Sequence, residues 1–364
     1  MTTEADPASA SHERLFAAMA FGASMLFAGW VVAHEALTLA SLARLVAAYV
    51  GVFILLFGTA LLCFIAVNFV RTGLRSNWTQ SPVAGIAGAL RQRWHQDRLL
   101  TLAWPLATFL LLIPAFNGFK QRILREVGFV HDPALAAADR LLFGVDPGLW
   151  LHQTIGSPAL TGFFDAVYHS WFVPTTLGLC VVGLCAGTRT RAQYMLAYVG
   201  TWILLGAVLA FAFPAAGPAF YQALVDPASA APFVEVHANL VAATTDARFL
   251  TSIYNQQYLL TNLDNPVLVV GGGISAIPSI HNAMAVLFAL ASFRAHWLAG
   301  VTMSLFALLI WVASVYLNWH YAVDGLAGAL GAVVLWFGAG KLVDVVMAIR
   351  SADRQYAPQA LPAS

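Results

Sequence analysis

Two histidines and one aspartate in the C-terminal part of the chain have the types and spacing that phosphoryl transfer needs. His320 and Asp324 are four residues apart in Asn318-Trp319-His320-Tyr321-Ala322-Val323-Asp324, so in a helix they share one face. The carboxylate can accept a hydrogen bond from one ring nitrogen and leave the other unprotonated as a nucleophile. We therefore expect His320 to attack phosphorus, Asp324 to orient it, and His281 to protonate the leaving oxygen as general acid.

A glycine-rich loop leads into the segment that carries His281. The run Gly271-Gly272-Gly273-Ile274-Ser275-Ala276-Ile277-Pro278-Ser279-Ile280-His281 predicts a loop and then a helix that begins near Pro278, because proline is tolerated in a first turn. Free amides at a helix start bind anions, Gly273 lets the backbone come close, and Ser279 adds a hydroxyl donor. A phosphoryl group fits such a site.

The composition places these residues in a membrane protein. The chain has 364 residues, of which 60% are hydrophobic and 10% charged, and its mean hydropathy is +0.75, too apolar for a water-soluble globule. A net charge of +1 argues against a nucleic-acid partner. Cys63, Cys180 and Cys185 show no metal-ligand or redox spacing. No metal or other cofactor is expected, since histidine supplies the nucleophile.

Apolar runs predict an all-α, polytopic fold with about eight transmembrane helices. A span needs roughly 20 helical residues to cross the hydrocarbon core. The expected spans lie near 15–33, 45–70, 99–116, 162–186, 193–213, 278–293, 296–317 and 321–348. The sixth is short and begins with polar residues, so it does more than anchor the chain. Each histidine alone could be a helix cap, but two at span ends, one paired with Asp324, favour catalysis because ionisable groups at membrane depth are costly.

The distribution of basic residues predicts the orientation. With a cytoplasmic N-terminus, twelve of the eighteen lysines and arginines fall in inner segments, which favours cytoplasmic N- and C-termini. The long loops 117–161 and 214–277 and the turn before His320 then lie outside. Sixteen arginines against two lysines, with abundant Ala, Gly and Leu, are typical of a GC-rich bacterial genome. The expected location is therefore a bacterial inner membrane with the site facing the periplasm.

The basic stretch between the second and third spans suggests a division of the chain. We expect an accessory unit of two helices over 1–98, a six-helix catalytic core over 99–349 and a cytoplasmic tail over 350–364.

The two motifs resemble those of a known family. Pro278-Ser279-Ile280-His281 and His320-Tyr321-Ala322-Val323-Asp324 are similar to the second and third signature motifs of the type 2 phosphatidic acid phosphatase superfamily. The resemblance covers roughly 99–345 and implies a six-helix core in which His320, Asp324 and His281 form the catalytic triad. More narrowly, Trp311, Ser314, Tyr316 and Leu317 and the run Phe213-Pro214-Ala215-Ala216-Gly217-Pro218-Ala219-Phe220-Tyr221 resemble the inositol phosphorylceramide synthase branch.

Two cations that are usual in the hydrolases of this superfamily are missing. There is no Lys ahead of an Arg-Pro pair in the first motif, and Ala313-Ser314 stands where Ser-Arg is usual. Lys120, Arg122 and Arg248 are possible substitutes, although each could equally be an interfacial cation meeting lipid headgroups. Tyr221 is a further candidate substrate-binding residue.

Two other segments could line a headgroup pocket. Asp165 and His169 lie near the outer end of the fourth span, where structural hydrogen bonding is the favoured interpretation. The stretch Tyr254-Asn255-Gln256-Gln257-Tyr258 offers amides and hydroxyls suited to a polyol.

Three functions remain open at this point. The first is transfer of a phospho-headgroup from a phospholipid to a lipid hydroxyl, as in inositol phosphorylceramide synthesis. The second is hydrolysis of phosphatidate or a polyprenyl phosphate, and the third, of a different class, is a lipid transporter or inactive scaffold. The expected partners are lipids and the bilayer, and the sequence does not define an oligomeric state.

Overall fold

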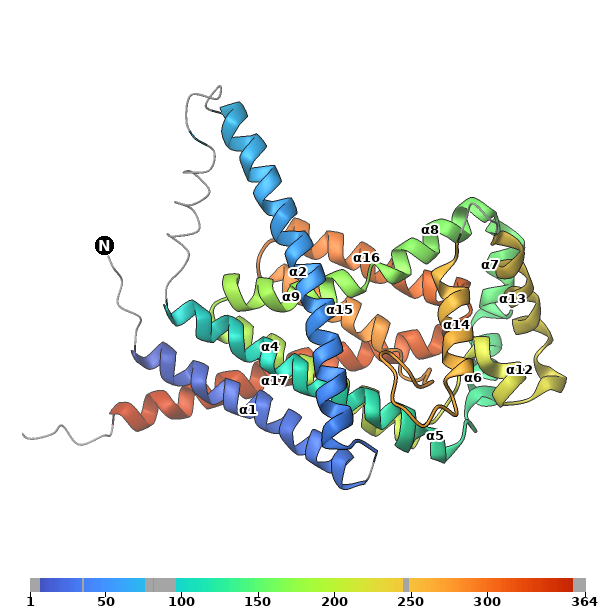
Figure 1. The fold of residues 1–364 in the computed structure, drawn as a ribbon, viewed down its shortest axis with the longest axis horizontal. Helices are drawn as coiled ribbons and strands as arrows, with labels where there is room; N and C mark the ends of the chain where they lie inside the picture. The colour runs from blue at the N-terminus through green and yellow to red at the C-terminus, as the bar shows by residue number, and fades with distance from the viewer. Residues whose placement is uncertain (1–6, 35, 76–80, 82–95, 245–248, 356–364) are drawn as a thin grey trace, which may run out of the picture.

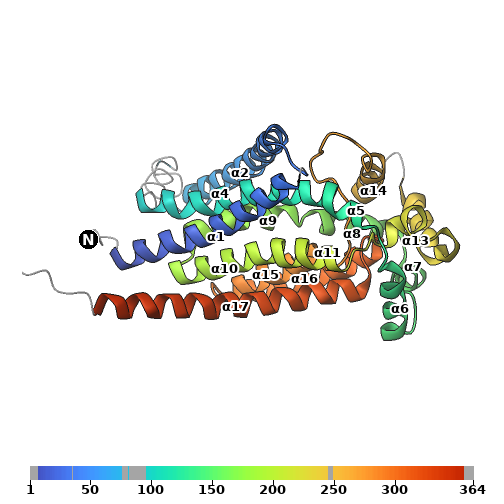
Figure 2. The ribbon, with the colours of Figure 1, turned by 90° about the horizontal axis from the view of Figure 1, so that it is seen from below.

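The structure, a computed structural model, describes residues 7–34, 36–75, 81, 96–244 and 249–355. Every regular element in these ranges is a helix, which confirms the all-α prediction. Arg248 lies outside the described residues. Most of the long helices run along the longest axis of the molecule, while α2 crosses them and shorter helices gather at one end (Figures 1 and 2).

Seven described helical stretches are long and apolar enough to cross a membrane, and they agree closely with the predicted spans. They are Ala10–Ala33, Leu39–Thr59, Leu100–Val127, Pro158–Cys185, Thr188–Ala212, Trp297–Tyr316 and Ala322–Arg350. The expected sixth span is the shorter apolar helix α15 (Ile280–Phe293). The protein is thus an integral membrane protein with seven candidate spans and one shorter apolar helix among the described residues.

Helix α15 lies at the centre of the bundle. It packs against α16 (Trp297–Tyr316) and α17 (Ala322–Gln355), and also against α10 (Thr188–Gly200). Six of its eleven apolar side chains are buried and, of the rest, only Phe293 is exposed, so its hydrophobicity reflects protein packing more than lipid contact. At 14 residues it is about 21 Å long, and His281 lies in its first turn.

Glycines let α17 approach this central helix closely. A Cβ at Gly328 would lie 2.3 Å from the carbonyl oxygen of Ser279, and one at Gly325 would lie 2.5 Å from Trp311. Small residues allow such contact between helix backbones. The start of α15 and the start of α17 are therefore held side by side.

The N-terminal helices differ in how much they contribute to the core. Helix α1 (Pro7–Ala33) packs against α4 (Gln96–Gly118) and α10, and its buried Glu13 accepts hydrogen bonds from Trp104 and Arg191. Helix α2 (Leu39–Arg75) contacts α4 and α9 (Phe172–Cys185), but most of its described side chains are exposed. The division at residue 98 stays a prediction, although α1 itself is tightly packed into the bundle.

A layer of short helices covers the end of the bundle away from the start of α1 (Figure 2). These are α6 (Asp132–Phe143), α7 (Pro147–Ile155), α12 (Tyr221–Leu224), α13 (Ala231–Ala243) and α14 (Thr251–Thr261). They come from the two long loops that the sequence places outside. The turn between α16 and α17, which carries His320, lies beneath them.

The fourth span is interrupted within the bundle. Helix α8 (Pro158–His169) ends and α9 begins at Phe172, with Ser170 and Trp171 between them. Pro174 has no N–H for the Ser170 carbonyl and its ring collides with that group in a continuous helix. The break therefore follows from the sequence, and it directs Tyr168 and Trp171 towards the start of α15.

The predicted orientation can be tested with single cysteines in a variant that lacks the three native ones. Asn318 is buried, so Leu142→Cys, at a position that is 60% exposed on α6, and Gly187→Cys, between α9 and α10, are the better sites. We expect an impermeant thiol reagent to label Leu142→Cys from outside and Gly187→Cys only after the membrane is opened. Labelling of both from the same side would contradict the orientation.

Candidate active site

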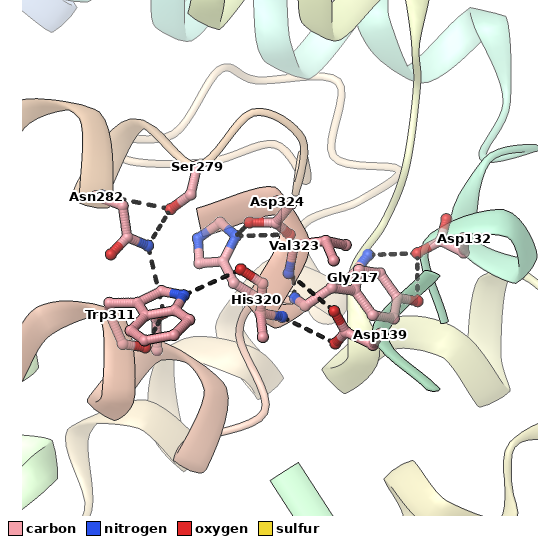
Figure 3. Close-up of polar contacts among 12 residues, drawn as sticks. Asp132, Asp139, Gly217, Ser279, Asn282, Trp311, His320, Val323 and Asp324 are labelled. Carbon is pink, nitrogen blue, oxygen red and sulfur yellow. Dashed lines mark hydrogen bonds and ion pairs between the residues drawn. The ribbon is translucent and has the colours of Figure 1, made fainter. Parts of the chain in front are cut away.

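His320 and Asp324 form the pair that their spacing predicts. Nδ1 of His320 lies 3.1 Å from Oδ1 and 3.3 Å from Oδ2 of Asp324, and both side chains are buried. Oδ2 also accepts the backbone N–H of Tyr321 at 3.1 Å. With Nδ1–H donating to the carboxylate, Nε2 carries the lone pair. Figure 3 shows the pair at the start of α17.

The turn that carries His320 is tightly constrained. The backbone N–H groups of His320 and Trp319 both donate to the Ser314 carbonyl, at 3.2 and 2.9 Å. Asn318 adopts a left-handed backbone with φ +64°, which asparagine tolerates better than most residues. The Asn318 side chain donates to the Phe233 carbonyl at 3.0 Å. The histidine is thereby fixed relative to both α16 and α13.

Asp139 of α6 caps the start of α17. Its two oxygens accept the backbone N–H groups of Ala322 and Val323, each at 2.8 Å, which would otherwise lack partners at a helix start. The carboxylate is 3% exposed; burial raises the pKa of Asp139 to about 6, although the two N–H bonds act in the opposite direction. A cavity of about 20 Å³ beside it, lined also by His320, has room for one water molecule.

Asp132, at the start of α6, holds the neighbouring loop in the same way. It accepts the N–H groups of Ala216 and Gly217 at 2.8 Å and the hydroxyl of Tyr321 at 2.9 Å (Figure 3). Its complete burial raises the pKa of Asp132, and the three donors oppose that rise. Tyr321 follows His320 directly, so this network fixes the residue next to the expected nucleophile.

The helix that carries His281 begins two residues later than the sequence suggested. Ser279 is its N-cap, and the serine Oγ accepts the N–H and the side-chain amide of Asn282, at 3.4 and 2.9 Å. Serine is a favoured N-cap because it accepts such a bond, whereas Pro278 precedes the helix. The Asn282 amide also contacts Ser314 at 3.4 Å. Ser279 is fully buried beside α17, and its proposed contact with phosphate stays a prediction.

His281 faces His320 across the start of the two helices. Their ring centroids are 6.1 Å apart, close enough for both imidazoles to contact one phosphoryl group. Tyr168 and Trp171 pack against the His281 ring with centroid distances of 4.7 and 4.2 Å. The Trp171 indole N–H also donates to the His281 carbonyl at 3.1 Å. The fourth span thus helps to hold the expected general acid.

Lys120 and Gly273, two of the predicted phosphate-binding residues, lie together. Gly273 has φ +84°, and a Cβ there would lie 2.8 Å from the Lys120 carbonyl carbon, so only glycine fits this close approach. The Lys120 ammonium is near enough to His281 to act on it electrostatically. Arg122 instead donates to the Pro266 carbonyl, and Arg125 pairs with Asp264. Lys120 is therefore the cation of this group that best matches the predicted role.

Tyr221 lies further from the histidines. Its ring packs against Phe233, and its hydroxyl is 3.3 Å from the Ser229 hydroxyl. It belongs to a buried cluster that includes Tyr321. Its contacts support the loop beneath α13, and a role in substrate binding stays a prediction.

Asp165 and His169 make the structural hydrogen bonds that the sequence favoured. Asp165 accepts the N–H groups of Thr251 and Ser252 at 2.8 Å, capping α14. His169 donates through Nδ1 to the Asp165 carbonyl at 2.8 Å, and its Nε2 lies 3.1 Å from the amide nitrogen of Asn255. His169 also acts electrostatically on His281, so this pair borders the site.

Sequence reasoning missed Asp132 and Asp139. Their spacing of seven places both on one face of α6, and acidic residues amid apolar ones in an outer loop were the available signal. Tyr168 and Trp171 were also missed as neighbours of His281. Among the described residues, no group of three His, Cys, Asp or Glu side chains is arranged to hold a metal ion.

Comparison with known proteins gives one clear match. A family model described as the PAP2 superfamily matches residues 133–337, more than half of the chain. The matched range runs from α6 into α17 and contains Ser279, His281, His320 and Asp324, whereas Lys120 lies before it. No curated protein and no solved structure gave a significant match.

We expect Asp139→Asn to impair the site by loosening the start of α17. The amide can accept only one of the two backbone N–H bonds, so the free energy of unfolding should fall by roughly 1–2 kcal/mol and turnover by about tenfold or more. Asp264→Asn is the control, since it removes an exposed ion pair with Arg125 and should change stability by less than about 0.5 kcal/mol. Wild-type turnover in Asp139→Asn would show that this cap does not position His320.

Proposed function

The chain belongs to the PAP2 superfamily, and from its site we propose that it is a lipid phosphotransferase working through a phosphohistidine on His320. Members of the superfamily are phosphatases or phosphotransferases that act on lipids. The observation that carries the proposal is the buried His320–Asp324 pair with the His281 ring 6.1 Å away. It provides a nucleophile, its orienting carboxylate and a proton donor for one phosphoryl group.

In the first half of the reaction the donor lipid loses its phospho-headgroup. Nε2 of His320 attacks phosphorus, a P–N bond forms, and the P–O bond to the diacylglycerol oxygen breaks. That oxygen takes a proton from His281 and leaves as an alcohol. Asp324 keeps the Nδ1 proton and stabilises the positive charge on the modified ring.

In the second half the acceptor restores the enzyme. A lipid hydroxyl gives its proton to His281, its oxygen bonds to phosphorus, and the P–N bond breaks to free His320. Water in place of the lipid hydroxyl would give hydrolysis. Exclusion of water from the intermediate therefore decides between the two outcomes.

The charge of the site favours a phosphodiester donor. A phosphomonoester carries about −1.5 to −2 charges near neutral pH, whereas a phosphodiester carries one. Lys120 acts on His281, while Arg122 and Arg125 are engaged elsewhere. Among the candidate cations that the structure describes, Lys120 alone acts on the site, and its single charge matches that of a diester, which supports a phospholipid donor over phosphatidate.

The polar side chains of α14 next to the site favour a substrate with a polar headgroup. Asn255 of α14 contacts His169, whereas Gln256 is buried and donates to the Leu317 carbonyl at 2.9 Å. Of the stretch 254–258, Asn255 is thus the side chain that the polyol proposal uses. Inositol transfer to ceramide, as in the inositol phosphorylceramide synthase branch, is the specific activity we propose.

The principal rival is hydrolysis of a lipid phosphate, which the superfamily also includes. The alternative of another class is a transporter or inactive scaffold, in which the buried His320–Asp324 pair would serve only to hold the start of α17. Detection of any turnover by the purified protein rejects that alternative.

Replacement of the two histidines should have different effects. His320→Ala should lower turnover at least about a thousandfold with every donor, because the covalent route is closed. His281→Ala should lose about a hundredfold or more with an alkyl leaving group but much less with a nitrophenyl phosphodiester, whose leaving group needs little protonation. Equal losses of His281→Ala with both donors would reject the general-acid role.

Acceptor dependence separates transfer from hydrolysis. Purified protein should be given phosphatidylinositol or phosphatidylglycerol with and without ceramide or diacylglycerol, and phosphatidate alone, and the products followed by mass spectrometry. We expect an acceptor-dependent lipid product from a diester and little inorganic phosphate from phosphatidate. Fast phosphate release from phosphatidate, without any transfer product, would establish the hydrolase instead.

A further inference from the structure

The ring of His281 packs against two aromatic side chains next to the break in the fourth span. Tyr168 stacks on it with an interplanar angle of 18° and a centroid distance of 4.7 Å. Trp171 lies at 4.2 Å and 36°. Both distances are within the roughly 6 Å at which an aromatic face attracts a cation.

His281 lacks a carboxylate partner like the one that Asp324 provides for His320. A protonated His281 ring therefore needs another source of stabilisation. Asp324 pairs with His320, but among the described residues no acidic side chain forms an ion pair with His281. The charged or titratable groups that act on it are His320, Lys120 and His169, and none of these supplies negative charge. A general acid must nevertheless be protonated before the leaving oxygen can take its proton.

We propose that Tyr168 and Trp171 are positioning residues that stabilise the protonated ring of His281 through the negative potential of their aromatic faces. This inference rests on the proposed function and adds to it a source of stabilisation for the general acid. The Trp171 N–H bond to the His281 carbonyl fixes the indole over the ring. The aromatic pair thus raises the fraction of enzyme that starts the donor step with a proton on His281.

Both aromatic residues lie beside the break in the fourth span. Tyr168 is the next-to-last residue of α8 and Trp171 directly precedes α9, so both reach α15 from neighbouring positions of the chain. His169, between them, is held away by Asp165 and Asn255.

The test compares an alkyl donor with a nitrophenyl phosphodiester that has the same headgroup. Tyr168→Leu and Trp171→Leu should each lower transfer from the alkyl donor on the order of tenfold and change the nitrophenyl reaction less than about threefold. Tyr168→Phe keeps the ring and should retain most activity. Trp202→Leu is the matched control: Trp202 packs near Trp171 without contacting His281, so any loss should be equal with both donors.

Two further measurements distinguish stabilisation of a charge from packing. Tyr168→Leu should have no additional effect in the His281→Ala background, because it acts through that ring. Replacing tryptophan by increasingly fluorinated analogues, which weakens the negative face at nearly constant shape, should lower the alkyl-donor rate stepwise, but not in Trp171→Phe.

Failure of this inference and failure of the proposed function give different results. Equal losses with both donors in the leucine variants, or a full further loss in the His281→Ala background, would overturn the role of the aromatic pair. If His281→Ala itself showed no dependence on the leaving group, the general-acid proposal would fall as well. If His281→Ala lost activity selectively with the alkyl donor but the leucine variants did not, only the role of Tyr168 and Trp171 would be rejected.

Discussion

The site depends on how the first N–H groups of α17 are satisfied. His320 and Asp324 straddle the start of that helix, where backbone donors have no partners within the helix. Asp139 accepts two of these donors and Asp324 a third. Because these bonds fix the helix start, the orientation of His320 depends on α6, an element far away in sequence. In the proposed reaction, Asp139 would thus set the geometry of the nucleophile.

Capping of backbone N–H groups by a buried aspartate occurs three times at the end of the bundle that the short helices cover. Asp132, Asp139 and Asp165 each accept two consecutive backbone N–H groups. Consecutive amides of this kind form a small concave site for an anion, and here a carboxylate of the chain occupies it. The loops over the bundle are therefore held by charge and hydrogen bonding as well as by apolar contacts.

The spans and the His–Asp pair were predictable because each depends on local sequence. Hydropathy located the helices to within a few residues at most ends, and the spacing of His320 and Asp324 fixed their shared face. The predicted start of α15, near Pro278, was slightly early. Proline suits a first turn, but in the structure Ser279 is the N-cap and the helix begins at Ile280. The capping role of Asp139 could not be predicted, since its partners are backbone N–H groups that begin 183 residues later. Nearly every residue type carries such a group, so the sequence gives no signal for this contact. The proximity of Tyr168 and Trp171 to His281 likewise depends on packing between separate spans.

The long separation between Asp139 and α17 has a consequence for biosynthesis. During synthesis, α6 is made well before α17. Asp139 therefore lacks its partners, the N–H groups of Ala322 and Val323, while the intervening spans insert. Contacts this distant in sequence form late, because closing the loop between them is entropically costly. The start of α17, which carries His320 and Asp324, is therefore capped in the final stage of assembly.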